Sequence, residues 1–264
     1  RAHGMLDGAP YRALQALARL SLAGASVVIG LGPSMAEILR GYAGEHVRIE
    51  SVPLWAPSEL EPWPAGEPVP LRAARGWERE RTVLMYSGNM GLGHRFGEFL
   101  EAARRGGGKG PRWVFAGAGR SRPEIEAFAA KHPEAGIELM PYAPEEQLRE
   151  HLCSADVHLV SLDAQWAGCI FPSKLQASFA LGKPVIFVGT DGQDMARWVR
   201  ESGGGWVVGE GDVDGLLQAV REASDPAERA RRGANALSYC RRELNQQHNV
   251  SRMLRMLTGG DELR

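Results

Sequence analysis

The residues with the clearest chemical potential lie between positions 168 and 188. Ser173 stands where the N-cap of a helix is expected, Lys174 follows it, and Gly182 and Pro184 end the helix before a buried apolar run. A helix start exposes backbone N–H groups without partners, and the lysine adds a full positive charge. This pattern predicts a phosphate site, with a nucleoside diphosphate as the first ligand to consider. The alternative is a capped scaffold helix with a solvated lysine.

A second candidate segment follows an expected strand over residues 82–87. Gly88, Gly91 and Gly93 would let the backbone approach a phosphate, and His94 and Arg95 bring donors and charge to the next helix start. The glycine order differs from the dinucleotide-binding fingerprint, and the chain has no P-loop. A turn without a ligand is the alternative for this segment.

The elements around these loops are strands alternating with helices. Apolar runs predict strands at 82–87, 113–116, 137–140, 157–161, 185–188 and 206–208. We therefore expect an α/β fold, a Rossmann-like parallel sheet with helices on both faces. The carboxyl ends of its strands would share one edge, where ligands of such sheets bind.

The chain divides into four parts by composition. Residues 1–52 read as the βα end of another Rossmann-like domain, and 53–76 contain six prolines, typical of an interdomain connector. Residues 77–225 form the regular block of strands and helices, and 226–264 are helical. The chain begins without Met, so we expect a fragment or a processed protein.

Composition excludes several function classes. Lys and Arg total 31 against 32 Asp and Glu, so no overall field favours nucleic acid. The three cysteines lack metal-binding spacing and fit a reducing cytoplasm, and the histidines form no known metal motif, so we expect no metal. No apolar run is long enough to span a membrane. Peripheral contact with the inner membrane face through an amphipathic surface stays open.

With these residues in view, the chain resembles the retaining family-four glycosyltransferases of bacterial exopolysaccharide and O-antigen assembly, mainly the C-terminal nucleotide-sugar-binding half of their GT-B fold. Three segments carry the resemblance: residues 86–94, residues 115–119, and residues 172–186. Their order and spacing agree over about residues 26–240. The part before residue 53 then corresponds to a remnant of the N-terminal, acceptor-side domain.

The resemblance implies roles for individual residues. His94, Arg95 and Lys174 would be catalytic, acting on the diphosphate or the sugar, and Tyr142 would meet the nucleobase. The other residues implied in substrate binding are Gly88, Asn89, Met90, Gly91, Gly93, Gly117, Gly119, Cys169, Pro172, Ser173 and Gln176. No cofactor is implied, because cationic side chains and helix starts can offset the diphosphate charge.

The sequence also departs from that family's pattern. Asn89 stands where many relatives carry an arginine, and only Arg95 could replace a later lysine. Cys169 and Ala177 stand where two glutamates are expected. The expected function is transfer of a hexose or aminohexose from a nucleotide diphosphate sugar to a saccharide or lipid-linked acceptor. The alternative is a non-catalytic nucleotide-sugar-binding half that serves a partner chain or needs a separate N-terminal domain.

Overall fold

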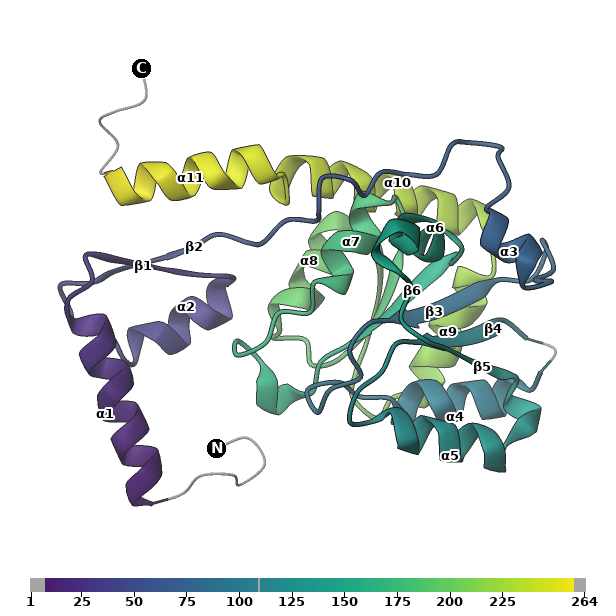
Figure 1. Ribbon diagram of the computed structural model, residues 1–264, viewed down its shortest axis with the longest axis horizontal. Helices are drawn as coiled ribbons and strands as arrows, with labels where there is room; N and C mark the ends of the chain where they lie inside the picture. The colour runs from purple at the N-terminus through teal and green to yellow at the C-terminus, as the bar shows by residue number, and fades with distance from the viewer. Residues whose placement is uncertain (1–7, 109, 259–264) are drawn as a thin grey trace.

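The computed structural model describes residues 8–108 and 110–258, which form a small N-terminal part beside a larger sheet domain (Figure 1). The N-terminal part consists of α1 (Ala9–Ala23), β1 (Val27–Gly30), α2 (Pro33–Arg40) and β2 (Arg48–Ser51). β1 and β2 pair in parallel as a two-stranded sheet. Three leucines of α1, Leu14, Leu17 and Leu20, are exposed.

The larger domain is built on six parallel strands, as the alternating pattern predicts. The strands are β3 (Val83–Ser87), β4 (Arg112–Ala116), β5 (Ile137–Met140), β6 (Val157–Ser161), β7 (Val185–Val188) and β8 (Gly205–Val208). Their order is β5-β4-β3-β6-β7-β8. The chain therefore reverses its direction of growth between β3 and β6, and the loops that leave these two strands diverge there.

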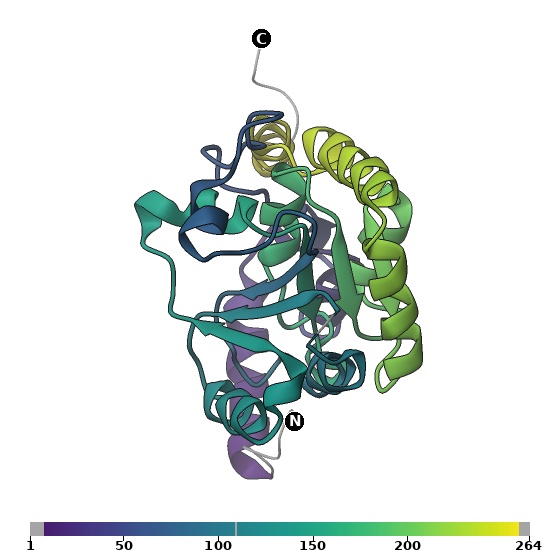
Figure 2. The same ribbon diagram turned by 90° about the vertical axis from the view of Figure 1, so that its right-hand side faces the viewer.

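Helices cover both faces of this sheet. They are α4 (Gly97–Gly106), α5 (Arg122–Lys131), α6 (Leu148–Cys153), α7 (Lys174–Ala180), α8 (Asp194–Ser202), α9 (Val213–Ala223) and α10 (Pro226–Glu243). Alternation along β3 shows the two faces: Leu84 and Tyr86 pack with α4, α5 and α9, whereas Val83 and Met85 face the opposite side. Figure 2 shows the yellow-green helices α9 and α10 lying to one side of the strands. The predicted α/β class is confirmed.

The helical end of the chain is broken rather than continuous. α10 ends at Glu243, and α11 (Gln246–Thr258) begins after Leu244 and Asn245. The last six residues of the range 226–264, which the sequence predicts to be helical, lie outside the described residues. α11 extends toward the N-terminal part (Figure 1), where Arg252 donates to the carbonyl of Ser51 at 3.4 Å. α11 thus contacts the end of β2.

The proline-rich segment is largely irregular, but it contains the short helix α3 (Pro70–Ala74). Arg72 on α3 pairs with Asp156 at 3.0 Å, next to the start of β6. Since Asp156 also accepts from the backbone N–H of Val83 at 2.8 Å, this pair anchors the segment to the sheet. In the part of the chain that the structure describes, no helix is both long and apolar enough to cross a membrane.

Candidate functional site

The site lies where β3 and β6 are neighbours and their outgoing loops separate. The loop after β3 carries the first glycine-rich segment, and the loop after β6 leads to Lys174 at the start of α7. In open parallel sheets this crevice is where ligands bind. The topology therefore brings together two segments that are about 80 residues apart in sequence.

The two glycine loops pack directly on each other. The N–H of Gly88 donates to the carbonyl of Ala116 at 2.9 Å, and that of Met90 to Ala118 at 2.8 Å. A Cβ on Gly117, whose φ is +122°, would lie 2.2 Å from the carbonyl oxygen of Gly88. A Cβ on Gly119 would lie 2.7 Å from the backbone of Met90. Gly117 and Gly119 are thus required for loop packing, and Met90 is buried beneath the first loop.

Lys174 reaches across to the first glycine loop. Its Cε lies 3.0 Å from where a Cβ on Gly88 would stand, and its Nζ lies 4.7 Å from the ring centroid of Tyr86. Burial lowers the pKa of Lys174 to about 8. Among the described residues, no carboxylate forms an ion pair with this ammonium group. The site therefore holds a positive charge that is shielded from solvent and that lies over the aromatic ring of Tyr86.

The start of α7 differs from the expected capped helix. Ser173 occupies the N-cap position, but its φ and ψ of −66° and −5° are helical and its side chain makes no capping hydrogen bond. The prediction of a side-chain cap is wrong, because a serine cap requires an extended backbone at that position. Ser173 is exposed, whereas Pro172 is buried behind it.

His94 is held as a neutral ring. Its Nδ1–H donates to the carbonyl of Ser161 at 2.8 Å, and its ring packs edge-on to Tyr86 at 5.7 Å. Burial, followed by the charge of Lys174, lowers the pKa of His94 to about 4. With Nδ1 acting as the donor, Nε2 carries a lone pair and can accept a hydrogen bond from a hydroxyl group. At neutral pH His94 therefore offers an acceptor rather than a positive charge.

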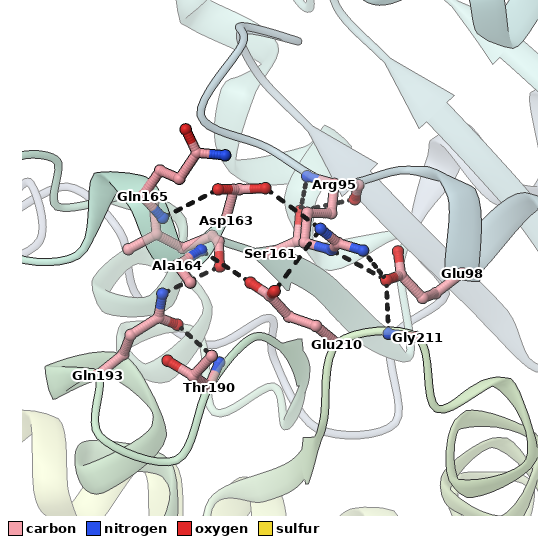
Figure 3. A network of polar contacts seen from close by, with 11 residues as sticks. Arg95, Glu98, Ser161, Asp163, Ala164, Gln165, Thr190, Gln193, Glu210 and Gly211 are labelled. Carbon is pink, nitrogen blue, oxygen red and sulfur yellow. Dashed lines mark hydrogen bonds and ion pairs between the residues drawn. The ribbon is translucent and has the colours of Figure 1, made fainter. Parts of the chain in front are cut away.

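Arg95 faces carboxylates instead of the glycine loop (Figure 3). It bonds to Glu98 at 2.6 Å, to Asp163 at 3.2 Å, and approaches Glu210 at 3.7 Å. Its backbone N–H donates to Oγ of Ser161, which donates back to the Arg95 carbonyl. Arg95 therefore lies among carboxylates, whereas its neighbour His94 packs against Tyr86.

The other predicted residues have varied surroundings. Asn89 and Cys169 are exposed, and Gly91 lies beside the side chain of Asn89. Gly93 is covered by Ile170 and Trp166 from the loop after β6. Gln176 is buried, and its Oε1 has no hydrogen-bond partner among the described residues.

Tyr142 borders the glycine loops from the end of β5. It is 52% exposed, and its hydroxyl donates to the carbonyl of Ala118 at 3.1 Å. It also lines a cavity of about 150 Å³ together with Met140 and His151. A larger hollow of about 450 Å³ is lined by His94, Arg95 and Asp163 among others.

Four site residues were missed by the sequence interpretation: Tyr86, Glu98, Ser161 and Glu210. Tyr86 and Ser161 could have been found, because each lies at or next to the carboxyl end of a strand predicted to reach the ligand edge. Glu98 and Glu210 do not lie at the end of a predicted strand at the ligand edge, so the sequence pattern did not point to them. No group of three or more His, Cys, Asp or Glu residues that could hold a metal ion occurs in residues 8–108 and 110–258.

Comparisons with known proteins agree with this arrangement. A family model described as "Glycosyl transferases group 1" matches residues 81–225. The chain is 24% identical over 217 residues to the probable glycosyltransferase WbjE of Pseudomonas aeruginosa, covering 82% of this chain and 54% of that protein. It thus spans about half the length of the curated relative it matches.

Solved structures show the same fold. The sucrose-phosphate synthase from Thermosynechococcus elongatus has a TM-score of 0.77 at 16% identity, with 96% of this chain and 64% of that chain covered. HepE from Anabaena, solved in complex with UDP-glucose, has a TM-score of 0.75 at 11% identity, with 95% and 70% covered. At these identities the likeness shows the fold alone, which is the GT-B fold.

Proposed function

The chain belongs to the group 1 glycosyl transferase family, and from this premise we propose that it moves a hexose or aminohexose from a nucleotide diphosphate sugar to a saccharide or lipid-linked acceptor. We assign it to the retaining family-four type that serves exopolysaccharide or O-antigen assembly. HepE, which shares the fold, was solved with UDP-glucose, and this supports a nucleotide diphosphate sugar as the donor.

One observation carries the proposal: the ammonium group of Lys174. It is shielded enough for its pKa to fall to about 8, yet no described carboxylate neutralises it. A shielded positive charge without a partner is costly unless a ligand supplies the negative charge. Its position beside Gly88, at the crevice between β3 and β6, is where a diphosphate would lie.

The chemistry follows from where charge develops. When the bond between the anomeric carbon and the phosphate oxygen breaks, negative charge grows on the departing diphosphate. Lys174 would stabilise that charge more strongly than it stabilises the intact donor, and this difference lowers the barrier. No metal or other cofactor is part of the proposal.

The surrounding residues complete the proposed donor site. The backbone of Gly88, Asn89 and Gly91 would approach the phosphates, and Ser173 would donate to them. His94 would accept a hydrogen bond from a donor hydroxyl, and Tyr142 would contact the nucleobase. We further propose a cytoplasmic location, because all three cysteines are free.

A second function is nucleotide-sugar binding without transfer. It is favoured by Cys169 and Ala177, which stand where acids are expected to hold the donor. The two functions share the diphosphate site. They differ in whether the sugar leaves the nucleotide when an acceptor is present.

Calorimetric titration with UDP-, GDP- and ADP-sugars tests the donor site. We expect one nucleotide to bind, and Lys174→Met to weaken it by about tenfold or more. Lys131→Met, at an exposed lysine on α5, is the matched control and should leave binding unchanged. Absence of binding to all three classes at millimolar concentration would remove the proposal. Release of free nucleotide in the presence of acceptor saccharides then separates transfer from binding alone.

A further inference from the structure

Arg95 lies in a setting unlike that of a phosphate-binding arginine. Its Nε and Nη2 donate to the same oxygen of Glu98, at 2.9 and 2.6 Å, and its Nη1 donates to Asp163 at 3.2 Å. Glu210 approaches the same Nη1 at 3.7 Å (Figure 3). Three carboxylates thus surround one guanidinium group. A diphosphate placed here would meet net negative charge and few free N–H donors.

The three carboxylates come from three different loops or helix starts. Glu98 lies in the first turn of α4, Asp163 in the loop after β6, and Glu210 in the loop after β8. Glu98 also accepts from the backbone N–H of Gly211 at 2.9 Å, so α4 is linked to the loop after β8 directly by this bond and indirectly through Arg95. Arg95 is therefore the common contact of three segments at the carboxyl edge of the sheet.

We propose that Arg95 is a positioning residue: its guanidinium group fixes the loop after β6, and through this loop Lys174, against the first glycine loop, without touching the donor. This inference deepens the proposed function and rests on it. It changes the role expected for Arg95 from a ligand of the donor to a support for the residue that binds it.

The path from Arg95 to Lys174 runs through hydrogen bonds and side-chain contacts of the loop after β6. Asp163 donates its backbone N–H to the carbonyl of Gly93 at 3.0 Å, and its carboxylate accepts from the N–H of Gln165 at 2.9 Å. Ile170 and Trp166 cover Gly93. The same segment then continues through Pro172 to the start of α7. Both loops are thus held together before any ligand arrives, which reduces the ordering cost of binding.

The carboxylates of Glu98 and Glu210, which lie beside Arg95, also accept hydrogen bonds from the backbone. Glu210 accepts from the N–H of Ala164 at 2.7 Å, next to Asp163. The pKa of Glu98 lies below its ordinary value: burial raises it, but hydrogen bonds from Arg95 and Gly211 outweigh that effect. Glu98 is therefore ionised at neutral pH and keeps its hold on Arg95.

Asp163→Asn distinguishes positioning from direct contact by the sign of its effect. If Arg95 contacted the diphosphate, removing a competing carboxylate would free its donors and tighten binding. If Arg95 positions the loop, the same change releases the loop and weakens binding. We expect Asp163→Asn and Arg95→Met each to weaken nucleoside diphosphate binding by about three- to tenfold. The double variant should be no weaker than Arg95→Met alone, because both changes break the same link.

The experiment is calorimetry of the full chain with UDP, GDP and ADP, and Asp214→Asn is the matched control. Asp214 also pairs with an arginine, Arg105 at 2.9 Å, but its side chain is 88% exposed, so binding should not change. If Arg95→Met does not fold, Asp163→Asn alone decides by its sign. Tighter binding by Asp163→Asn would overturn the inference and leave the proposed function standing. Failure of the unaltered chain to bind any of the three would overturn both.

Discussion

The carboxylate of Asp194 accepts a hydrogen bond of 3.0 Å from the backbone N–H of Ser34, which lies 160 residues earlier in the chain. Asp194 is buried at the start of α8 and also pairs with Arg197 at 2.7 Å. Ser34 lies in the first turn of α2, where unpaired N–H groups attract negative charge. A helix of the N-terminal part is thus held by an acid of the sheet domain.

Replacing Asp194 with alanine should loosen this contact. The change leaves the N–H of Ser34 and one side of Arg197 without partners, and we expect a loss of about 1–3 kcal/mol in the free energy of unfolding. Hydrogen exchange should rise over residues 33–40, while the strands of the larger sheet stay protected. Asp191→Ala is the control, since Asp191 pairs with Arg200 but is 81% exposed. Unchanged exchange over α2 would contradict the role of Asp194.

Gly117→Ala should displace the first glycine loop, which packs against Gly117. The new Cβ would stand 2.2 Å from the Gly88 carbonyl oxygen at a φ of +122°, so the first glycine loop must move or the fold must strain. We expect a loss of about 2–5 kcal/mol in stability together with weaker nucleotide binding. Gly97→Ala, where nothing lies within 4 Å of the added atom, should be tolerated. Equal thermal midpoints for the two variants would refute the packing argument.

The strands could be predicted from the sequence because parallel strands buried on both faces read as short apolar runs. The run 185–188, for example, is β7, completely buried. The positions and capping of helix starts were harder to predict from the sequence. Ser173 has the residue type of a cap but helical backbone angles, and α3 forms within a proline-rich segment because Pro70 suits the first helical position.

Predicting the contacts of the site requires the order of the strands in the sheet, which local sequence does not encode. Lys174 meets Tyr86 only because β6 lies beside β3, although β4 and β5 intervene in sequence. The carboxylates beside Arg95 could not be found from local sequence either, since Asp163 and Glu210 follow it by 68 and 115 residues and come from separate loops. An arginine beside a glycine loop therefore suggested a phosphate ligand, whereas the fold surrounds it with carboxylates.

His94 should stay neutral in solution well below pH 6. Burial and the neighbouring Lys174 hold its folded pKa at about 4, against 6.5 for an ordinary histidine. The contribution of neutral His94 to the free energy of unfolding is thus complete above about pH 6.5. It is lost as pH falls toward 4, because the unfolded chain binds the proton at a higher pH than the folded chain does. Long-range ¹H–¹⁵N NMR, assigned with His94→Gln, should show protonated Nδ1 and bare Nε2 at pH 7. A titration midpoint near 6.5 would contradict the assignment.

Lys174→Met should make the free protein more stable. The folded pKa of about 8 lies below the ordinary 10.5, so the charged form is penalised in the fold at neutral pH, and this penalty fades as pH rises from 8 to 10.5. Removing the charge should raise the free energy of unfolding by about 1–3 kcal/mol at pH 7, after loss of the contact with Tyr86 is deducted. Chemical denaturation measures this. A destabilised variant would mean that Lys174 has a structural partner instead of a functional role.

The most direct test of the central claim is the pH dependence of nucleoside diphosphate affinity, measured by calorimetry between pH 7 and pH 9. Phosphate groups, with a second pKa of about 6, are already about 90% deprotonated at pH 7, so their own titration changes little over this range. If the ammonium group of Lys174 binds the diphosphate, affinity should fall by about tenfold from pH 7 to pH 9 as the free protein loses this proton. Lys174→Met should bind weakly with no such fall. The same affinity and the same pH profile in both proteins would contradict the account.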